Sequence, residues 1–172
     1  MNEPAMATAR LADKPVKYFE DYVPGDVVEV DASYLVTEEE ILEIGKRWDP
    51  QPFHTDRKAA AASFFGGLVA SSVHLFAASV WLGYQMESQA AAVTALGFSE
   101  LSWHEPARPG DRLRLRAETL RRRESRSRPD CGIVESRSQI FNQDGKLVFS
   151  FDGAVLMRKR PLDPRSDPGK DQ

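Results

Sequence analysis

The sequence is poor in the features that mark secreted, membrane-spanning and disulfide-bonded proteins. Its single cysteine, Cys131, has no partner for an internal disulfide, so nothing indicates an oxidising compartment. No apolar run approaches the roughly 20 residues that a membrane-spanning helix needs. Residues 1–15 also lack the apolar segment of a secretory signal. We therefore expect a cytoplasmic protein that does not enter a membrane.

Several motifs of cofactor-dependent and nucleophilic enzymes are missing as well. There is no glycine-rich dinucleotide fingerprint and no G-x-S-x-G segment, which disfavours nicotinamide or flavin binding and a serine-based triad. His74 and His104 stand alone, and no spacing matches a zinc site or a two-histidine iron site. The prediction is a protein that holds no metal and no organic cofactor.

What the sequence does contain is typical of one folded domain. Its 172 residues are 41% hydrophobic and 28% charged, with a net charge of −3, which is enough for one sizeable core. Polar stretches dotted with proline open and close the chain, and we predict flexible tails over residues 1–16 and 160–172. The folded domain is expected between them, over residues 17–159.

The first part of this domain predicts a strand and two short helices. A proline-glycine turn leads into a strand at about 27–36. Thr37 is a suitable N-cap, and Glu40 stands three residues later as its capping-box partner. Asp56 is expected to cap a second short helix, which the glycines at 66–67 end.

The second part predicts one long helix followed by strands. Residues 71–89 contain no proline, and their apolar residues lie almost all round, as in a helix buried inside a sheet. Strand-like runs follow near 95–105, 111–123, 132–142 and 146–158. This order predicts an α+β domain in which one face of an antiparallel sheet covers a central helix.

Arginine is concentrated in one part of the chain. Residues 108–128 hold nine arginines and three acidic residues, and Arg112, Arg114 and Arg116 alternate with leucines. This period of two predicts a half-buried strand whose charges face solvent. The alternative is a site for an anionic ligand with phosphates. Nucleic acid is disfavoured as a partner, because the net charge is negative and no aromatic residues interleave with the arginines.

The stretch WDPQPFHTD, residues 48–56, combines an acid and an imidazole with two prolines. Pro50 and Pro52 each push the preceding residue towards an extended conformation, so Asp49 and His54 are expected on a stiff loop. Such a loop suits groups that must be held for catalysis. The pair could divide general acid and base work, hold a metal, or consist of ordinary loop residues. The residue types alone leave these alternatives open.

Together with further segments, this stretch resembles the hydratase signature of the MaoC-like dehydratases, the hotdog-fold group that includes the (R)-specific enoyl-CoA hydratases. The resemblance covers roughly residues 18–158. It is carried by DPQPFH at 49–54, Asp56, FGGLVAS at 65–71, His74, WHEP at 103–106 and RPGD at 108–111. The resemblance implies a single hotdog domain, an antiparallel sheet wrapped around one long central helix.

In the family that the chain resembles, an aspartate and a histidine activate the water that adds to a trans-2-enoyl thioester, or leaves in the reverse dehydration. The matching residues are Asp49 and His54. A backbone N–H at the start of the central helix stabilises the thioester oxygen, and its matching position is Ser72. The resemblance further implies substrate contacts at Phe65, Gly66, Gly67, Ser71 and His74. The substrate would be a coenzyme A thioester, and the protein a homodimer or a higher hotdog oligomer.

The chain departs from the family pattern at two positions. Ser72 replaces the usual glycine, and Gln51 replaces the asparagine of the fatty-acyl members. His74 can contact the thioester, or it can make hydrogen bonds within or between subunits. Two other functions stay open, a hotdog thioesterase and a non-catalytic acyl-CoA-binding subunit. Hotdog thioesterases tend to carry a carboxylate on the central helix, and residues 71–86 contain none.

Overall fold

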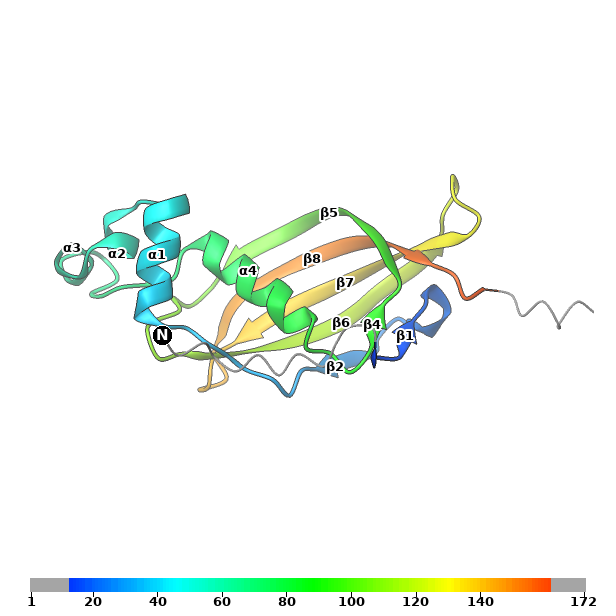
Figure 1. The fold of residues 1–172 in the computed structure, drawn as a ribbon, viewed down its shortest axis with the longest axis horizontal. Helices are drawn as coiled ribbons and strands as arrows, with labels where there is room; N and C mark the ends of the chain where they lie inside the picture. The colour runs from blue at the N-terminus through cyan, green and yellow to red at the C-terminus, as the bar shows by residue number, and fades with distance from the viewer. Residues whose placement is uncertain (1–12, 162–172) are drawn as a thin grey trace, which may run out of the picture.

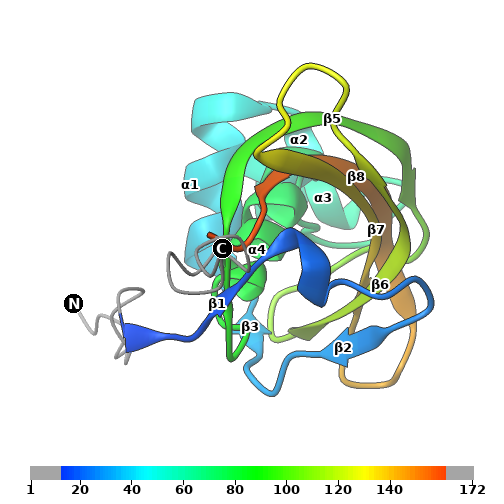
Figure 2. The same ribbon diagram turned by 90° about the vertical axis from the view of Figure 1, so that its right-hand side faces the viewer.

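An antiparallel sheet curves around a central helix in the computed structural model, which describes residues 13–161 (Figure 1, Figure 2). The sheet has six strands in the order β2-β6-β7-β8-β5, with β3 paired to β6 beside this path. These strands are β2 (Val27–Glu29), β3 (Tyr34–Leu35), β5 (Ala92–Trp103), β6 (Arg112–Glu124), β7 (Cys131–Phe141) and β8 (Leu147–Arg158). The predicted α+β architecture is confirmed.

The remaining elements are short, apart from two helices. A separate parallel pair joins β1 (Val16–Lys17) to β4 (Gln89–Ala90). The helices are η2 (Phe19–Asp21), α1 (Glu38–Trp48), α2 (Pro52–Thr55), α3 (Arg57–Ala61) and α4 (Ser72–Gly83). None of the helices in residues 13–161 is long and apolar enough to span a bilayer. Of the predicted flexible tails, residues 1–12 and 162–172 lie outside the described part of the chain.

The core lies between α4 and the concave face of the sheet. Leu113 and Leu115 on β6 are buried, whereas the arginines between and beside them, Arg112 and Arg114, are exposed. A pleated strand sends alternate side chains to opposite faces, so the leucines meet the helix and the charges meet solvent. The predicted orientation of this strand is therefore confirmed.

The outward arginines line a cavity of about 480 Å³ on the far side of the sheet. Arg112, Arg114 and Arg116 share its wall with the acids Glu29 and Asp31. The Arg116 guanidinium also donates to the side-chain oxygen of a neighbour on β7 at 2.7 Å and faces a carboxylate of its own strand at 3.5 Å. The positive charge of this face is thus partly balanced by adjacent acids.

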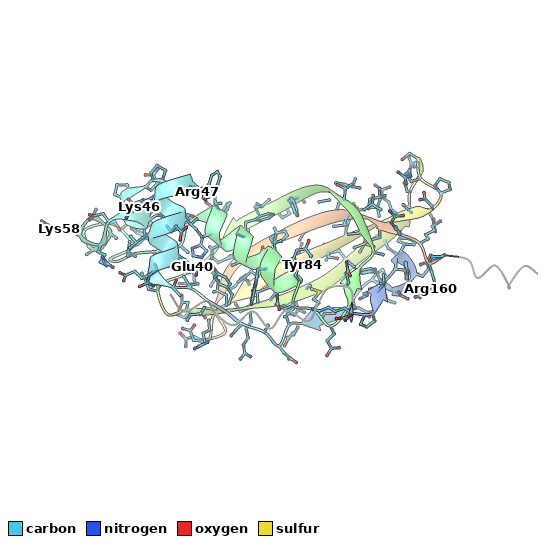
Figure 3. All side chains as sticks on the ribbon, in the orientation of Figure 1. Glu40, Lys46, Arg47, Lys58, Tyr84 and Arg160 are labelled. Carbon is cyan, nitrogen blue, oxygen red and sulfur yellow. The ribbon has the colours of Figure 1, made fainter. Side chains whose placement is uncertain are left out.

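The central helix is shorter and less covered than the sequence predicts. α4 ends at Gly83 rather than near residue 89, and only one of its faces packs against the sheet. Val73 and Val80 remain exposed on the other face, as does Tyr84 just beyond the end of the helix (Figure 3). The apolar residues that surround this helix therefore exceed what the sheet of one chain can bury.

The segment before the first long helix also differs in detail. The strand predicted at about 27–36 consists of two short pieces, β2 and β3, which both pair with β6. The predicted helix starts are confirmed: the Thr37 hydroxyl accepts from the Glu40 N–H at 3.2 Å, and the Asp56 carboxylate accepts from a backbone N–H of α3 at 2.6 Å. α1, α2 and α3 gather at one end of the sheet, next to the start of α4 (Figure 1).

Candidate active site

Asp49 stands at the exact end of α1. It is the C-cap of this helix, and its backbone N–H donates to the Gly45 carbonyl oxygen at 3.0 Å. Pro50 follows and cannot continue the helix, because it has no N–H and its ring clashes with the preceding turn. The helix end and the proline together fix where the half-buried Asp49 carboxylate lies.

His54 lies on α2, a single turn that starts at Pro52. The stiff segment predicted around the two prolines is thus partly helical, since proline at the first helical position is pre-set for a helix. The His54 ring is 7% exposed, and its Nδ1 lies 2.7 Å from the Val69 carbonyl oxygen. A carbonyl only accepts, so Nδ1 carries the proton and Nε2 of the neutral ring keeps a free lone pair.

Asp49 and His54 face each other, as the sequence pattern indicated. The Asp49 Oδ2 and His54 Nε2 atoms are 3.6 Å apart. This distance exceeds a direct hydrogen bond but is close enough for an ion pair once the imidazole is protonated. The unprotonated nitrogen of the ring therefore points at a carboxylate rather than at a neutral group.

Gly45 allows this approach, and sequence reasoning missed it. A Cβ at this position would lie 2.5 Å from the His54 carbonyl oxygen and 2.9 Å from the His54 Cβ. Only glycine lets α1 and α2 pack this closely. The one available signal was a glycine inside a helical pattern, which is unfavourable unless packing requires it.

A cavity of about 380 Å³ opens beside the imidazole. His54 and Ser72 line it together with aromatic residues, including Phe65 and Trp103. Asp49 contacts the ring but is outside the set of residues that line this cavity. The arrangement joins an acid–base pair to an apolar space that can hold a small molecule.

The other residues to which the resemblance assigns substrate contacts lie either at the cavity or outside its lining. Phe65 lines the cavity, and Gly66 follows with a φ of 65°, in the left-handed region that favours glycine. Gly67 lies against the side chain of Arg108, also part of the lining. Ser71 is buried outside the lining, where it caps α4.

Ser72 is the first residue of α4 and presents an unpaired donor. Its N–H makes no hydrogen bond within residues 13–161, whereas the N–H of His74 is capped by the Ser71 hydroxyl at 3.3 Å. The first N–H groups of a helix point out of its N-terminus, where the helix dipole is positive. The predicted oxyanion position therefore belongs to a residue that lines the cavity and whose N–H has no partner among the described residues.

His74 belongs to a second polar cluster behind the first turn of α4. It is 1% exposed, and its Nε2 forms a hydrogen bond of 2.9 Å with the Tyr34 hydroxyl. Its Nδ1 has no partner among the described residues. Burial lowers the pKa of His74, against an opposing effect of the Glu40 carboxylate on α1 (Figure 3). Burial and the same carboxylate raise the pKa of Tyr34.

The structure thus separates two sets of predicted residues. Asp49, His54, Ser72 and Phe65 meet at or beside the cavity, whereas His74 is in the cluster with Tyr34. Nothing in the sequence indicated Tyr34, because it approaches α4 from a distant strand. Within residues 13–161, no group of three histidine, cysteine or acidic residues is arranged to hold a metal ion.

A curved antiparallel sheet around one central helix is the hotdog fold, and here an acid–imidazole pair lies beyond the start of that helix. Residues 20–139 match the MaoC like domain, and the chain belongs to the MaoC-like dehydratase family. The resemblance noted in the sequence is therefore confirmed over most of the folded part. Family membership gives the reaction class, hydration or dehydration, in general terms.

Three similar proteins place the chain within this family. The crystal structure of a MaoC-like dehydratase from Rhodospirillum rubrum is 37% identical, with a TM-score of 0.79 over 85% of this chain and 99% of that one. An (R)-hydratase from A. caviae is 25% identical, with a TM-score of 0.63 over 83% and 99%. A mesaconyl-CoA hydratase from Cereibacter sphaeroides is 38% identical over 69 residues, which are 40% of this chain but span only 20% of that protein.

Proposed function

We propose that this protein is a hydro-lyase that reversibly hydrates a trans-2-enoyl thioester of coenzyme A to the 3-hydroxyacyl thioester. One observation carries the proposal: the Asp49 carboxylate faces the free nitrogen of His54 at 3.6 Å, and His54 lines a cavity. Membership of the MaoC-like family supports the reaction class. The names of two similar proteins, a mesaconyl-CoA hydratase and an (R)-hydratase, support hydration and the coenzyme A carrier.

In the proposed mechanism, Asp49 and His54 hold the attacking water between them. Their separation of 3.6 Å is too long for a direct hydrogen bond but suits a water that contacts both groups. Because the Val69 carbonyl keeps the proton on Nδ1, Nε2 is free to take a proton from this water. The water oxygen bonds to the β-carbon, and the protonated His54 then gives a proton to the α-carbon. Asp49 stabilises the imidazolium in between.

The negative charge of the transition state develops on the thioester oxygen. The Ser72 N–H is the proposed donor to this oxygen, since it lies on the cavity wall at the positive end of α4. A backbone donor of this kind is fixed before the reaction begins and needs no rearrangement. The serine side chain, in place of the usual glycine, narrows the space beside the thioester.

The cavity suits a short acyl group. Its volume of about 380 Å³ lies near the lower end of the range for small-molecule sites, and its lining is mostly apolar. We propose that the acyl chain lies against Phe53 and Phe65 while the thioester points towards Ser72. The reaction as written needs no metal and no organic cofactor, and this absence stays a prediction, as does the cytoplasmic location.

A homodimer, or a higher oligomer built from it, is the proposed assembly. The uncovered face of α4 exposes Val73 and Val80, and β5 exposes Leu96, Phe98 and Leu101. Exposed apolar side chains that gather on neighbouring elements mark protein interfaces. A second copy of the chain, which carries the same two faces, would bury them.

Thioester hydrolysis is less well supported by the same site. α4 reads SVHLFAASVWLG and contains no carboxylate that could activate a water for attack on the thioester carbon. The acid that is present lies at the end of α1, where it faces the imidazole. A non-catalytic acyl-CoA-binding subunit is disfavoured because both members of the acid–imidazole pair are present.

The test is hydration of crotonyl-CoA, measured as loss of the enoyl-thioester absorbance, with Asp49→Asn as the main variant. We expect turnover in the wild type and a loss of about 10²–10⁴-fold in this variant, which keeps the shape but not the charge. Asp56→Asn is the matched control, because asparagine caps a helix as well as aspartate does, and it should retain activity.

Binding of butyryl-CoA separates the remaining outcomes. If Asp49→Asn binds this saturated analogue as tightly as the wild type does, the lost activity reflects chemistry rather than folding or affinity. Equal turnover by wild type and Asp49→Asn would contradict the assigned pair. Binding without turnover of crotonyl-CoA or of longer and branched enoyl thioesters would favour the non-catalytic alternative.

A further inference from the structure

Arg108 carries a guanidinium that no described carboxylate neutralises, at the edge of the cavity that contains His54. None of the ion pairs within residues 13–161 includes this side chain. The carboxylate of Asp111, three residues later, accepts from the backbone N–H of Arg108 at 2.7 Å instead. The cavity therefore has a permanent positive charge in its lining that no carboxylate of the described residues pairs with.

Among the described residues, one hydrogen bond holds this guanidinium in place, and its other donors have no partner. Its Nη2 donates to the Phe65 carbonyl oxygen at 2.7 Å. Nη1 lies beside Gly67, where a Cβ would make an ordinary van der Waals contact at 3.5 Å, so glycine leaves this side of the group uncovered. Arginine has five N–H donors in a fixed plane, and the single bond that Arg108 donates to Phe65 leaves the others for a ligand.

Two aromatic rings separate Arg108 from the proposed catalytic histidine. The Phe65 ring lies 5.0 Å from that of Phe53, which lies 4.5 Å from the His54 ring. All of these residues belong to the same cavity lining. A molecule in this cavity can thus have its reacting carbons at His54, an apolar middle against the phenylalanines, and a charged group at Arg108.

We propose that Arg108 binds an anionic group of the thioester substrate, either a carboxylate at the end of the acyl chain or a phosphate of the carrier. Carboxylate and phosphate groups can both accept two parallel hydrogen bonds from a guanidinium, which fixes orientation as well as adding affinity. The inference rests on the proposed function, because it places the same thioester in the cavity. If the anion belongs to the acyl chain, the substrate class is the half-thioester of an unsaturated dicarboxylic acid.

Glu105 restricts where the anionic group of such a ligand can lie in the cavity. It lines the same cavity but forms no ion pair with Arg108. A ligand carboxylate near Glu105 would be repelled, whereas one near Arg108 would be attracted. The two groups therefore favour an anion on the Arg108 side of the cavity, which Phe65 also lines.

Isothermal titration calorimetry with four unreactive thioesters tests the inference without any turnover. The ligands are pentanoyl and glutaryl thioesters, each made with coenzyme A and with N-acetylcysteamine, which has no phosphate. The main variant is Arg108→Gln, which removes the charge. Arg108→Lys keeps the charge but not the planar fork, and Arg112→Gln, an exposed arginine outside this cavity, is the matched control.

Two patterns support the inference and identify the source of the anion. If it is an acyl carboxylate, Arg108→Gln weakens both glutaryl ligands by about 10–100-fold and leaves both pentanoyl ligands unchanged. If it is a carrier phosphate, the variant weakens both coenzyme A ligands and neither N-acetylcysteamine ligand. Arg108→Lys should lose less affinity than Arg108→Gln in either case, and Arg112→Gln should lose none.

The contrary results are equally distinct. Equal weakening of all four ligands by Arg108→Gln would mean that Arg108 only braces the Phe65 backbone, and the inference would fall. No weakening, or no binding of any of the four ligands to the wild type, would overturn it as well. The proposed function is judged separately by crotonyl-CoA turnover, so either conclusion can fail while the other stands.

Discussion

His54 and His74 are both almost fully buried next to the start of α4, yet their ring nitrogens have different surroundings. In His54, a backbone carbonyl holds Nδ1 and leaves Nε2 facing a carboxylate beside a cavity. In His74, the Tyr34 hydroxyl occupies Nε2, and the ring is outside the lining of that cavity. Burial and proximity are common to both residues, so they do not identify a catalytic base. A catalytic base is instead identified by a ring nitrogen with a free lone pair, an acidic neighbour and access to a ligand.

Replacing the two histidines separately should give the largest difference between them. His54→Asn keeps an N–H for the Val69 carbonyl but loses the nitrogen that faces Asp49. His74→Gln keeps a group that can bond to Tyr34. We expect kcat for crotonyl-CoA to fall by about 10²–10⁴-fold in the first variant and by less than about tenfold in the second.

Circular dichroism of both variants supplies the control for folding. If His74→Gln loses as much kcat as His54→Asn while it melts like the wild type, the division between the two clusters is wrong. His74 would then be part of the chemistry, in spite of its position behind the cavity.

A second contrast concerns two glycines that lie on the helices of the two clusters. Gly45→Ala should lower the free energy of unfolding by about 1–3 kcal/mol, because the new methyl group would overlap the His54 backbone. Gly83→Ala, at the end of α4, meets nothing within 4 Å and should be neutral or slightly stabilising. Urea unfolding of both variants measures the difference.

The same pair of variants connects packing to activity. Gly45→Ala should also reduce turnover, because α2 must shift for the methyl group to fit, and His54 would shift with it. A stable Gly45→Ala protein with wild-type activity would show that the close approach of α1 and α2 is not needed for the acid–imidazole geometry.

The smallest expected effect is on the pH dependence of stability. Burial lowers the pKa of His74 below its ordinary value of 6.5, so at moderately acidic pH the unfolded chain binds this proton more readily than the folded one. The contribution of the neutral His74 ring to the free energy of unfolding is complete above about pH 6.5, and it is lost as the pH falls below that value. The charges that oppose or add to this effect are Glu40, which favours protonation, and His54, which disfavours it.

Unfolding at pH 7.5 and at pH 5.5 measures this contribution. His74→Gln should lose less stability between these two conditions than the wild type does, by up to about 1 kcal/mol. Identical losses in the wild type and His74→Gln would contradict the assignment.

The sequence predicted those structural features that depend on residues close to one another along the chain. The caps at Thr37 and Asp56 and the alternation along β6 are local patterns, and all three are confirmed. The spacing of Asp49 and His54 is local too, and it indicated the pair. Because α1 ends at this point and α2 forms a single helical turn, the two side chains face each other.

What could not be predicted depends on contacts between distant segments. The end of α4 is one case: the Lys14 ammonium donates to the carbonyl oxygens of Tyr84 and Met86, at 2.9 and 2.7 Å, just where a longer helix was expected. The Val69 carbonyl that sets the protonated nitrogen of His54 is another. Tyr34 approaches His74 from forty residues earlier in the chain, and no pattern around either residue indicates that meeting.

The position of β5 at the end of the sheet has a consequence for how the protein behaves on dilution. Within residues 13–161, this strand of 12 residues pairs with β8 on one side only, and the opposite edge of the sheet ends in β2, which has three residues. The unpaired backbone N–H and C=O groups of a long edge strand with apolar side chains can form hydrogen bonds with a strand of another chain. If a second copy normally covers it, mass action makes the melting temperature rise with protein concentration. Purified protein stored too dilute would then lose its partner first, and only afterwards its fold.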